Sequence, residues 1–191
     1  MTNRYEEVDE SVIAVLSTIR KKSFPELVNA KIKPLFDLKK RVSGGSIVLA
    51  RIMLPNELIK YFTSNEKKGI EDGYDYIIAI DKVIWQNAPS TDRERLLRHE
   101  LRHTFIDIEA DNPYRLIDHD VSDFYEEMEL NQDDPRWKER VASLAETIYE
   151  QMKDEAKSRG RGRGRKDVGP IYDGPTPIEV YAAERAESKE E

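Results

Sequence analysis

The three histidines of the chain all lie between residues 99 and 119, and two of them share a short motif with a glutamate. In "HELRH", His99 and His103 are four residues apart, so on a helix both imidazoles project from one face. Two imidazoles at this spacing can bind one zinc ion, and a glutamate beside the first can reach a metal-bound water. We interpret His99 and His103 as ligands of one Zn²⁺ ion. Glu100 is then the general base, and later the acid that protonates the leaving amine.

The motif leaves the third ligand open. His119 follows after a loop and could complete a three-histidine site with one open position. The compact pattern with a glycine and a third histidine is absent, since Ile106 and Glu109 occupy those positions. A carboxylate is the alternative third ligand, from Asp123, Glu126 or Glu127. We favour His119, because imidazole suits zinc and surplus carboxylates on a helix usually face solvent.

Other polar residues near the histidines are candidates for supporting roles. Asp107, Asp120 and Asp123 could each orient an imidazole by accepting its second N–H. Tyr114 could donate a hydrogen bond to a developing oxyanion, although an aromatic residue that covers the core fits the same position. The sequence does not choose among these residues.

The motif also has a non-functional interpretation, because 36% of the residues in this chain are charged. In that interpretation, the two histidines are exposed to solvent on a helix surface stabilised by i,i+4 charge pairs. The position of His119 favours the metal site, because all three histidines fall in one short segment. No Walker-type loop, nucleotide fingerprint or Ser-His-Asp arrangement supports another catalytic class.

Length and composition are those of one soluble domain with polar ends. The chain has 191 residues, a net charge of −7 and no cysteine, which excludes disulfides, thiolate metal sites and a cysteine nucleophile. No run is long enough to cross a bilayer, and the start "MTNRYEEVDE" lacks the features of a secretory signal. We expect a cytoplasmic protein that does not bind membranes, and the sequence does not indicate its oligomeric state.

Hydrophobic spacing predicts an α+β domain over residues 1–157, with a small three-stranded mixed sheet packed on helices. The strands are expected near 31–38, 47–54 and 74–85, with a turn at Gly44-Gly45. Pro34 suits only the edge of a sheet. The third strand could hold an extended substrate through main-chain hydrogen bonds, although most apolar strands fill a core.

The motif is expected within a helix over residues 91–109, where Thr91 and Glu94 fit a capping box. The face that packs lies roughly 160° from the histidines, at about 3.6 residues per turn, and carries Leu97, Leu101 and Ile108. Further helices are expected at 7–20, 56–62, 120–130 and from residue 137 onward.

Residues 158–191 are predicted to form a flexible tail, with at most a short helix at 178–187. Its Gly/Arg run could neutralise phosphates and bind nucleic acid weakly and without sequence preference, through Arg159, Arg161, Arg163 and Arg165. The run could equally act as a linker or dock on the acidic segment 107–134.

Several blocks between residues 24 and 130 resemble the phage metallopeptidases, relatives of the SprT-like zincins. In chain order they are "AKIKPLFDLKK", "LARIMLPNEL", "YDYIIAIDKVIW", "LLRHELRHTFID" and "HDVSDF". SprT-like proteins bind zinc through the two motif histidines and a later histidine followed by a phenylalanine, and His119 with Phe124 looks like that element. The resemblance implies His99, His103 and His119 as ligands and Glu100 as catalyst. It also implies a helix and a small mixed sheet, with the motif helix stacked beneath the sheet.

The resemblance has one clear departure. SprT-like proteins often continue into a cysteine-bearing zinc module that binds DNA, whereas this chain has no cysteine, so a role in DNA repair is not carried over. We predict a zinc-dependent metallopeptidase of protein or peptide substrates, in the cytoplasm of a bacterial host if the protein is phage-encoded. The alternative is a non-catalytic zinc-bound module that binds a protein or a nucleic acid.

Overall fold

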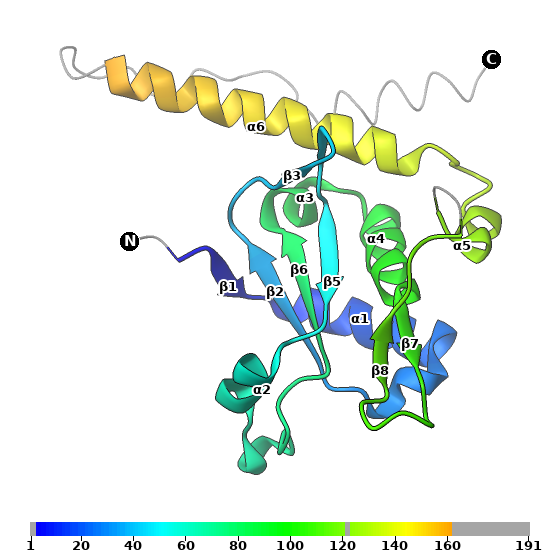
Figure 1. The fold of residues 1–191 in the computed structure, drawn as a ribbon. Coiled ribbons are helices and arrows are strands. Elements are labelled where there is room, and N and C mark those ends of the chain that lie inside the picture. Colours follow the sequence, from blue (N-terminus) through cyan, green and yellow to red (C-terminus); the bar gives the residue numbers. More distant parts are fainter. Residues whose placement is uncertain (1–2, 121–122, 162–191) are drawn as a thin grey trace. The chain divides into compact units, whose positions relative to one another are not determined.

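The computed structural model describes residues 3–120 and 123–161 (Figure 1). Side chains are described no further than residue 158. The chain divides into two units, Met1–Tyr149 and Glu150–Glu191. The first unit contains every described strand and confirms the predicted mixture of helices and sheet.

The main sheet has four strands in the order β1-β2-β6-β5. They are β1 (Tyr5–Glu7), β2 (Ile32–Asp37), β5 (Ala50–Met53) and β6 (Tyr76–Asp81). The sheet is mixed, because β2 and β6 are parallel while β1 and β5 run antiparallel to their neighbours. The prediction of three strands was wrong by one. The start of the chain, part of which we expected to be helical, forms β1 and pairs with the end of β2.

The inner strands differ from expectation in two ways. All six residues of β6 are buried between β2 and β5, so β6 has no free edge and the edge strand is β5. Pro34 lies in the inner strand β2, contrary to the prediction of an edge. It is tolerated because β1 pairs only as far as Leu35, which leaves Pro34 with a strand neighbour on one side.

Two of the predicted strands are shorter than expected, one because a hairpin turn precedes it and the other because a helix follows it. The predicted Gly44-Gly45 turn is confirmed; both glycines have positive φ and join β3 (Val42–Ser43) to β4 (Ser46–Ile47), so β5 begins only at Ala50. β6 ends at Asp81, whose carboxylate caps α3 (Lys82–Asn87) by accepting from the N–H of Ile84.

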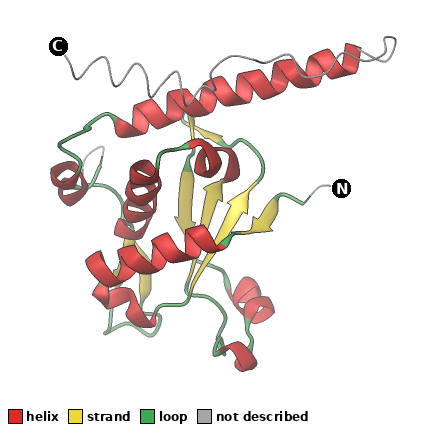
Figure 2. Ribbon diagram, turned by 180° about the vertical axis from the view of Figure 1, so that it is seen from behind, coloured by secondary structure: helices red, strands yellow, loops and turns green. Residues whose placement is uncertain are grey.

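The helix α1 (Glu10–Ser23) crosses one face of the sheet, as Figure 2 shows from behind. Asp9 caps its first turn, and its apolar stripe buries Val12, Leu16 and Ile19 in the core. Burial of each such side chain contributes about 1.5–3 kcal/mol. The short α2 (Glu57–Thr63) follows β5 as predicted.

The motif lies near the end of α4 (Ser90–Arg102). Leu97 and Leu101 are fully buried, as their shared face predicts. The helix is shorter than expected: it stops at His103, and Ile108 lies outside it with 88% of its surface exposed. The predicted capping box at Thr91 is absent, because the helix begins one residue earlier, after Pro89, without a side-chain cap.

The remaining helices are α5 (Tyr125–Leu130) and α6 (Trp137–Arg161). α5 starts five residues later than predicted. α6 begins at Trp137 as predicted and extends past residue 157, so the predicted flexible tail is helical at its start. Arg163, Arg165 and the helix predicted at 178–187 lie outside the described residues, as do the side chains of Arg159 and Arg161. No described helix has the length and apolarity needed to cross a membrane.

Candidate metal centre

A helix end and a β-hairpin bring the three histidines together. His99 and His103 lie on the last turn and the C-cap of α4. The chain then forms β7 (Thr104–Ile106) and β8 (Tyr114–Leu116), which pair antiparallel. This hairpin returns the chain to the helix end, where the N–H of Ile117 donates to the carbonyl of His103. His119, two residues further on, therefore arrives beside the motif.

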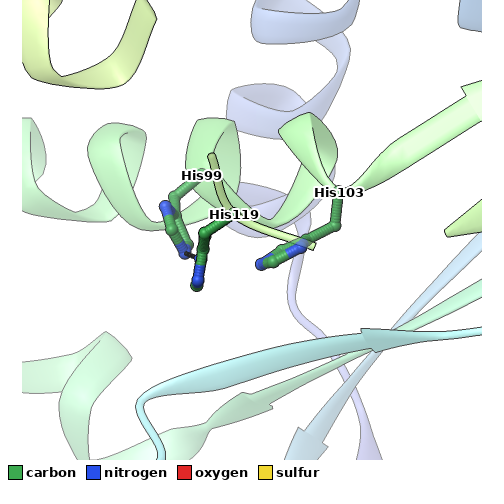
Figure 3. Close-up of side chains that lie close together, drawn as sticks. All are labelled: His99, His103 and His119. Carbon is green, nitrogen blue, oxygen red and sulfur yellow. Dashed lines mark hydrogen bonds between the residues drawn. The ribbon is translucent and has the colours of Figure 1, made fainter. Parts of the chain in front are cut away.

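The three imidazoles turn toward one another (Figure 3). One potential ligand atom from each of His99, His103 and His119 lies within 4.8 Å of the other two. Nε2 of His119 is 3.1 Å from Nε2 of His99. Nδ1 of His103 is 2.8 Å from the carbonyl oxygen of Ile117. This contact favours the tautomer with hydrogen on Nδ1, which leaves Nε2 of His103 with a free lone pair.

Phe124 packs against all three histidines. Its ring centroid lies 5.7 Å from that of His99, 4.8 Å from that of His103 and 5.0 Å from that of His119. Only 4% of the Phe124 surface is exposed. The phenylalanine thus gives the cluster an apolar wall, which restricts the rotation of each ring.

Asp123 connects the histidines to α6. Its Oδ1 lies 3.0 Å from Nδ1 of His99, and its Oδ2 lies 2.8 Å from Nζ of Lys138. Burial opposes ionisation of Asp123, but these contacts and the backbone N–H of Phe124 outweigh it and hold the pKa of Asp123 well below its usual range. The carboxylate is therefore ionised and directs Nε2 of His99 toward the other histidines.

Burial determines the protonation of His99 and His119. It lowers the pKa of His99 to about 4, against the opposing effect of Asp123, and it also lowers the pKa of His119. Both rings are neutral at pH 7, and a metal ligand needs the neutral form.

The donor set fits a zinc ion. Two nitrogens that share a tetrahedral zinc lie about 3.3 Å apart, for bonds of about 2.0–2.1 Å. The observed 3.1 Å between Nε2 of His99 and Nε2 of His119 is close to this value. Three imidazole ligands would leave a fourth position open, as in catalytic zinc sites.

The carboxylates considered as alternative ligands have other partners. Glu127 is fully buried, and both its oxygens accept from Nε of Arg98. Glu126 pairs with Arg102. Asp123 faces Nδ1 of His99. None of the three belongs to the one group of potential metal ligands among the described residues.

The other predicted supporting residues have contacts with groups other than the three imidazoles. Asp120 accepts from the N–H of Tyr125. Asp107 lies in the turn between β7 and β8, where it accepts from the N–H of Glu109. Tyr114 packs against Tyr76, with ring centroids 5.5 Å apart, and lines a cavity that includes none of the three histidines.

Glu100 points from α4 toward the edge strand β5. Its carboxylate accepts a hydrogen bond from the backbone N–H of Ile52. Burial raises the pKa of Glu100 to about 7, against the opposing effects of this bond and of Lys138 and Arg51. A carboxyl group with this pKa can both accept and release a proton near neutral pH.

Sequence reasoning missed two parts of the centre. Lys138 was not among the predicted site residues, because no local pattern links it to Asp123. The edge strand beside Glu100 is β5, whereas the expectation named β6. The order of strands in a sheet depends on tertiary pairing, so the spacing of apolar residues did not reveal it.

Comparison with protein families matches residues 2–149 to the family described as "Putative phage metallopeptidase". The match covers most of the 191 residues, including the three histidines and Glu100. No curated protein and no solved structure matches the chain significantly.

Proposed function

The chain belongs to this phage metallopeptidase family, and on that premise we propose that it hydrolyses peptide bonds with the help of one zinc ion. The observation that carries the proposal is the convergence of His99, His103 and His119 beside Glu100. In the same proposal the domain is a zincin related to the SprT-like proteins, and its substrate is a protein or a peptide.

His99, His103 and His119 would hold the ion through their imidazole nitrogens. Bound zinc supplies a Lewis acid that lowers the pKa of a water molecule and polarises a carbonyl oxygen.

Glu100 moves the proton in the proposed reaction. Its carboxylate accepts a proton from water as the water oxygen bonds to the carbonyl carbon of the substrate. The same proton then passes from Glu100 to the leaving nitrogen as the C–N bond breaks, which restores the carboxylate. The hydrogen bond from Ile52 keeps the carboxylate in place between these two transfers.

The edge strand β5 offers a place for an extended substrate. The carbonyl of Leu49 accepts from the N–H of Asp81, so the main-chain groups at this position face β6. Those of Ala50 face the opposite way, because alternate residues of an antiparallel edge strand turn their N–H and C=O outward. A substrate strand could therefore pair with β5 next to Glu100.

The test is the variant Glu100→Gln, assayed with zinc-loaded protein on a mixed peptide library by mass spectrometry. We expect cleavage to slow by about 10²–10⁴-fold, because the amide cannot accept the proton. Zinc content should be unchanged. Glu94→Gln is the matched control, since Glu94 is exposed on the same helix, and it should cleave at the wild-type rate.

The same assay separates the competing function. Wild-type cleavage by Glu100→Gln would exclude Glu100 as the base. A zinc-loaded wild type that cleaves nothing in the library would favour the non-catalytic module, which binds a protein or nucleic acid. The predicted binding of nucleic acid by the Gly/Arg run and the predicted cytoplasmic location stay predictions.

A further inference from the structure

A cavity of about 320 Å³ adjoins the histidines and Glu100 on the side of the β3–β4 hairpin. His99 and Glu100 form part of its wall. Most of the other lining side chains are apolar: Ile47, Leu49, Ala50, Leu96, Trp137 and Ala142. The cavity is therefore a recess with a mainly apolar lining beside the group that would move the proton.

The recess lies at the part of β5 where a substrate strand would pair. Ala50 lines the cavity and is also the residue whose main-chain groups face outward at the free edge. A peptide paired with Ala50 would lie between the edge strand and α4. In an extended peptide, side chains alternate between the two faces, so a side chain near this pairing can enter the recess.

We propose that this cavity binds an apolar side chain of the substrate, next to the bond that is cleaved. The inference rests on the proposed peptidase function and adds a substrate class to it: segments with a residue such as Leu, Met or Phe at that position. The volume accommodates such a side chain, and its burial against Leu96 and Trp137 removes apolar surface from water.

Lys138 does not make the cavity a site for an acidic side chain. Lys138 lines it, but Nζ of Lys138 lies 2.8 Å from the carboxylate of Asp123. Glu139 also lines it and is exposed to solvent. An acidic substrate group would lose its hydration against the mainly apolar walls and gain no free partner in Lys138.

The first experiment is cleavage profiling of a peptide library by wild type, Ala142→Leu and Ser143→Leu. Ala142 lines the cavity, whereas the neighbouring Ser143 is exposed, so both variants add bulk to the same helix but only Ala142→Leu narrows the recess. We expect wild type to prefer Leu, Met or Phe over Gly by at least about tenfold on one side of the cleaved bond. Ala142→Leu should shift this preference to smaller residues, and Ser143→Leu should keep it.

Equal cleavage at all residue types on both sides of the bond would overturn the inference. An unchanged preference in Ala142→Leu would also overturn it. A second measurement separates this failure from failure of the proposed function. The backbone amide signals of Leu96 and Ala142 are followed by NMR during titration with N-acetyl-leucinamide and, separately, N-acetyl-glycinamide. Shifts with the leucine compound alone support the cavity even if no peptide is cleaved, and equal or absent shifts overturn it.

Discussion

Lys138, in the first turn of α6, donates from Nζ to Oδ2 of Asp123 across 2.8 Å. The contact ties a helix that starts 34 residues after His103 to a histidine of the metal centre, because the other oxygen of Asp123 lies 3.0 Å from Nδ1 of His99. Lys138 is a positioning residue in this arrangement, since it contacts Asp123, whose other oxygen faces His99.

Lys138→Met should weaken zinc binding by about 10–100-fold, the usual cost of losing an outer partner of a metal ligand. The affinity is measured by competition with a chromophoric chelator. Lys138→Arg should restore most of it, since guanidinium also pairs with a carboxylate. The free energy of unfolding of the zinc-free protein should change by less than about 1 kcal/mol, because Lys138 is partly exposed. Wild-type zinc affinity in Lys138→Met would disprove the positioning role.

Much of the centre could be predicted because its signals are local. The spacing of His99 and His103 depends only on helix geometry. His119 could be named because no other histidine remained. Asp123 was a candidate for two roles, and only the fold shows that it faces Nδ1 of His99. Lys138 was not predicted, because its contact depends on how α6 packs.

In the fold, too, features that depend on local spacing could be predicted, whereas features that depend on tertiary pairing could not. The apolar spacing of Val12, Leu16 and Ile19 predicts a buried helical face, and the structure has it. The length of α4 was overestimated, because the periodicity of apolar residues continues to Ile108 although the chain turns into β7 after His103. β1 was missed since its three residues are exposed and gain their pairing from β2, far along the chain.

His119→Ala should bind zinc more weakly than wild type by more than the roughly 100-fold that loss of an outer partner can cause. The reason is that it removes an imidazole nitrogen that lies within 4.8 Å of the other two potential ligand atoms. Glu126→Ala is the control, because the carboxylate of Glu126 pairs with Arg102. Metal content by mass spectrometry measures both. Loss of zinc in Glu126→Ala but not in His119→Ala would show that the third ligand is the carboxylate of Glu126 and not His119.

Asp92→Asn should lower the free energy of unfolding by about 1–3 kcal/mol, because it removes a buried carboxylate that accepts from Arg95 and Arg140, while both arginines keep Asp134 as a partner. Only 2% of the Asp92 surface is exposed, and its carboxylate accepts from Arg95 and from both terminal nitrogens of Arg140. These contacts join α4 to α6 within the first unit. Denaturant unfolding of the zinc-free protein gives the value.

The control for Asp92 is Asp154→Asn, because the pair that Asp154 makes with Lys157 is exposed on both sides. An exposed pair contributes at most about 1 kcal/mol. Equal losses in the two variants would show that the α4–α6 contact does not stabilise the unit.

Gly73→Ala and Gly69→Ala separate the cost of a positive φ from the cost of a close approach. Both glycines have positive φ, 79° for Gly73 and 68° for Gly69. A Cβ at Gly73 would lie 2.4 Å from the backbone oxygen of Lys60 in α2, whereas a Cβ at Gly69 meets nothing within 4 Å. Gly69→Ala should therefore lower the free energy of unfolding by only about 1–2 kcal/mol, the cost of placing a Cβ on a left-handed backbone.

Gly73→Ala should lower the free energy of unfolding by about 1–3 kcal/mol more than Gly69→Ala does, because backbone atoms of α2 must shift to make room for the Cβ. α2 buries none of its residues, so its approach to Gly73 is one of the few contacts that can hold it beside the end of β5. Thermal unfolding of both variants measures the difference. Equal destabilisation would mean that α2 moves freely and that Gly73 serves the turn alone.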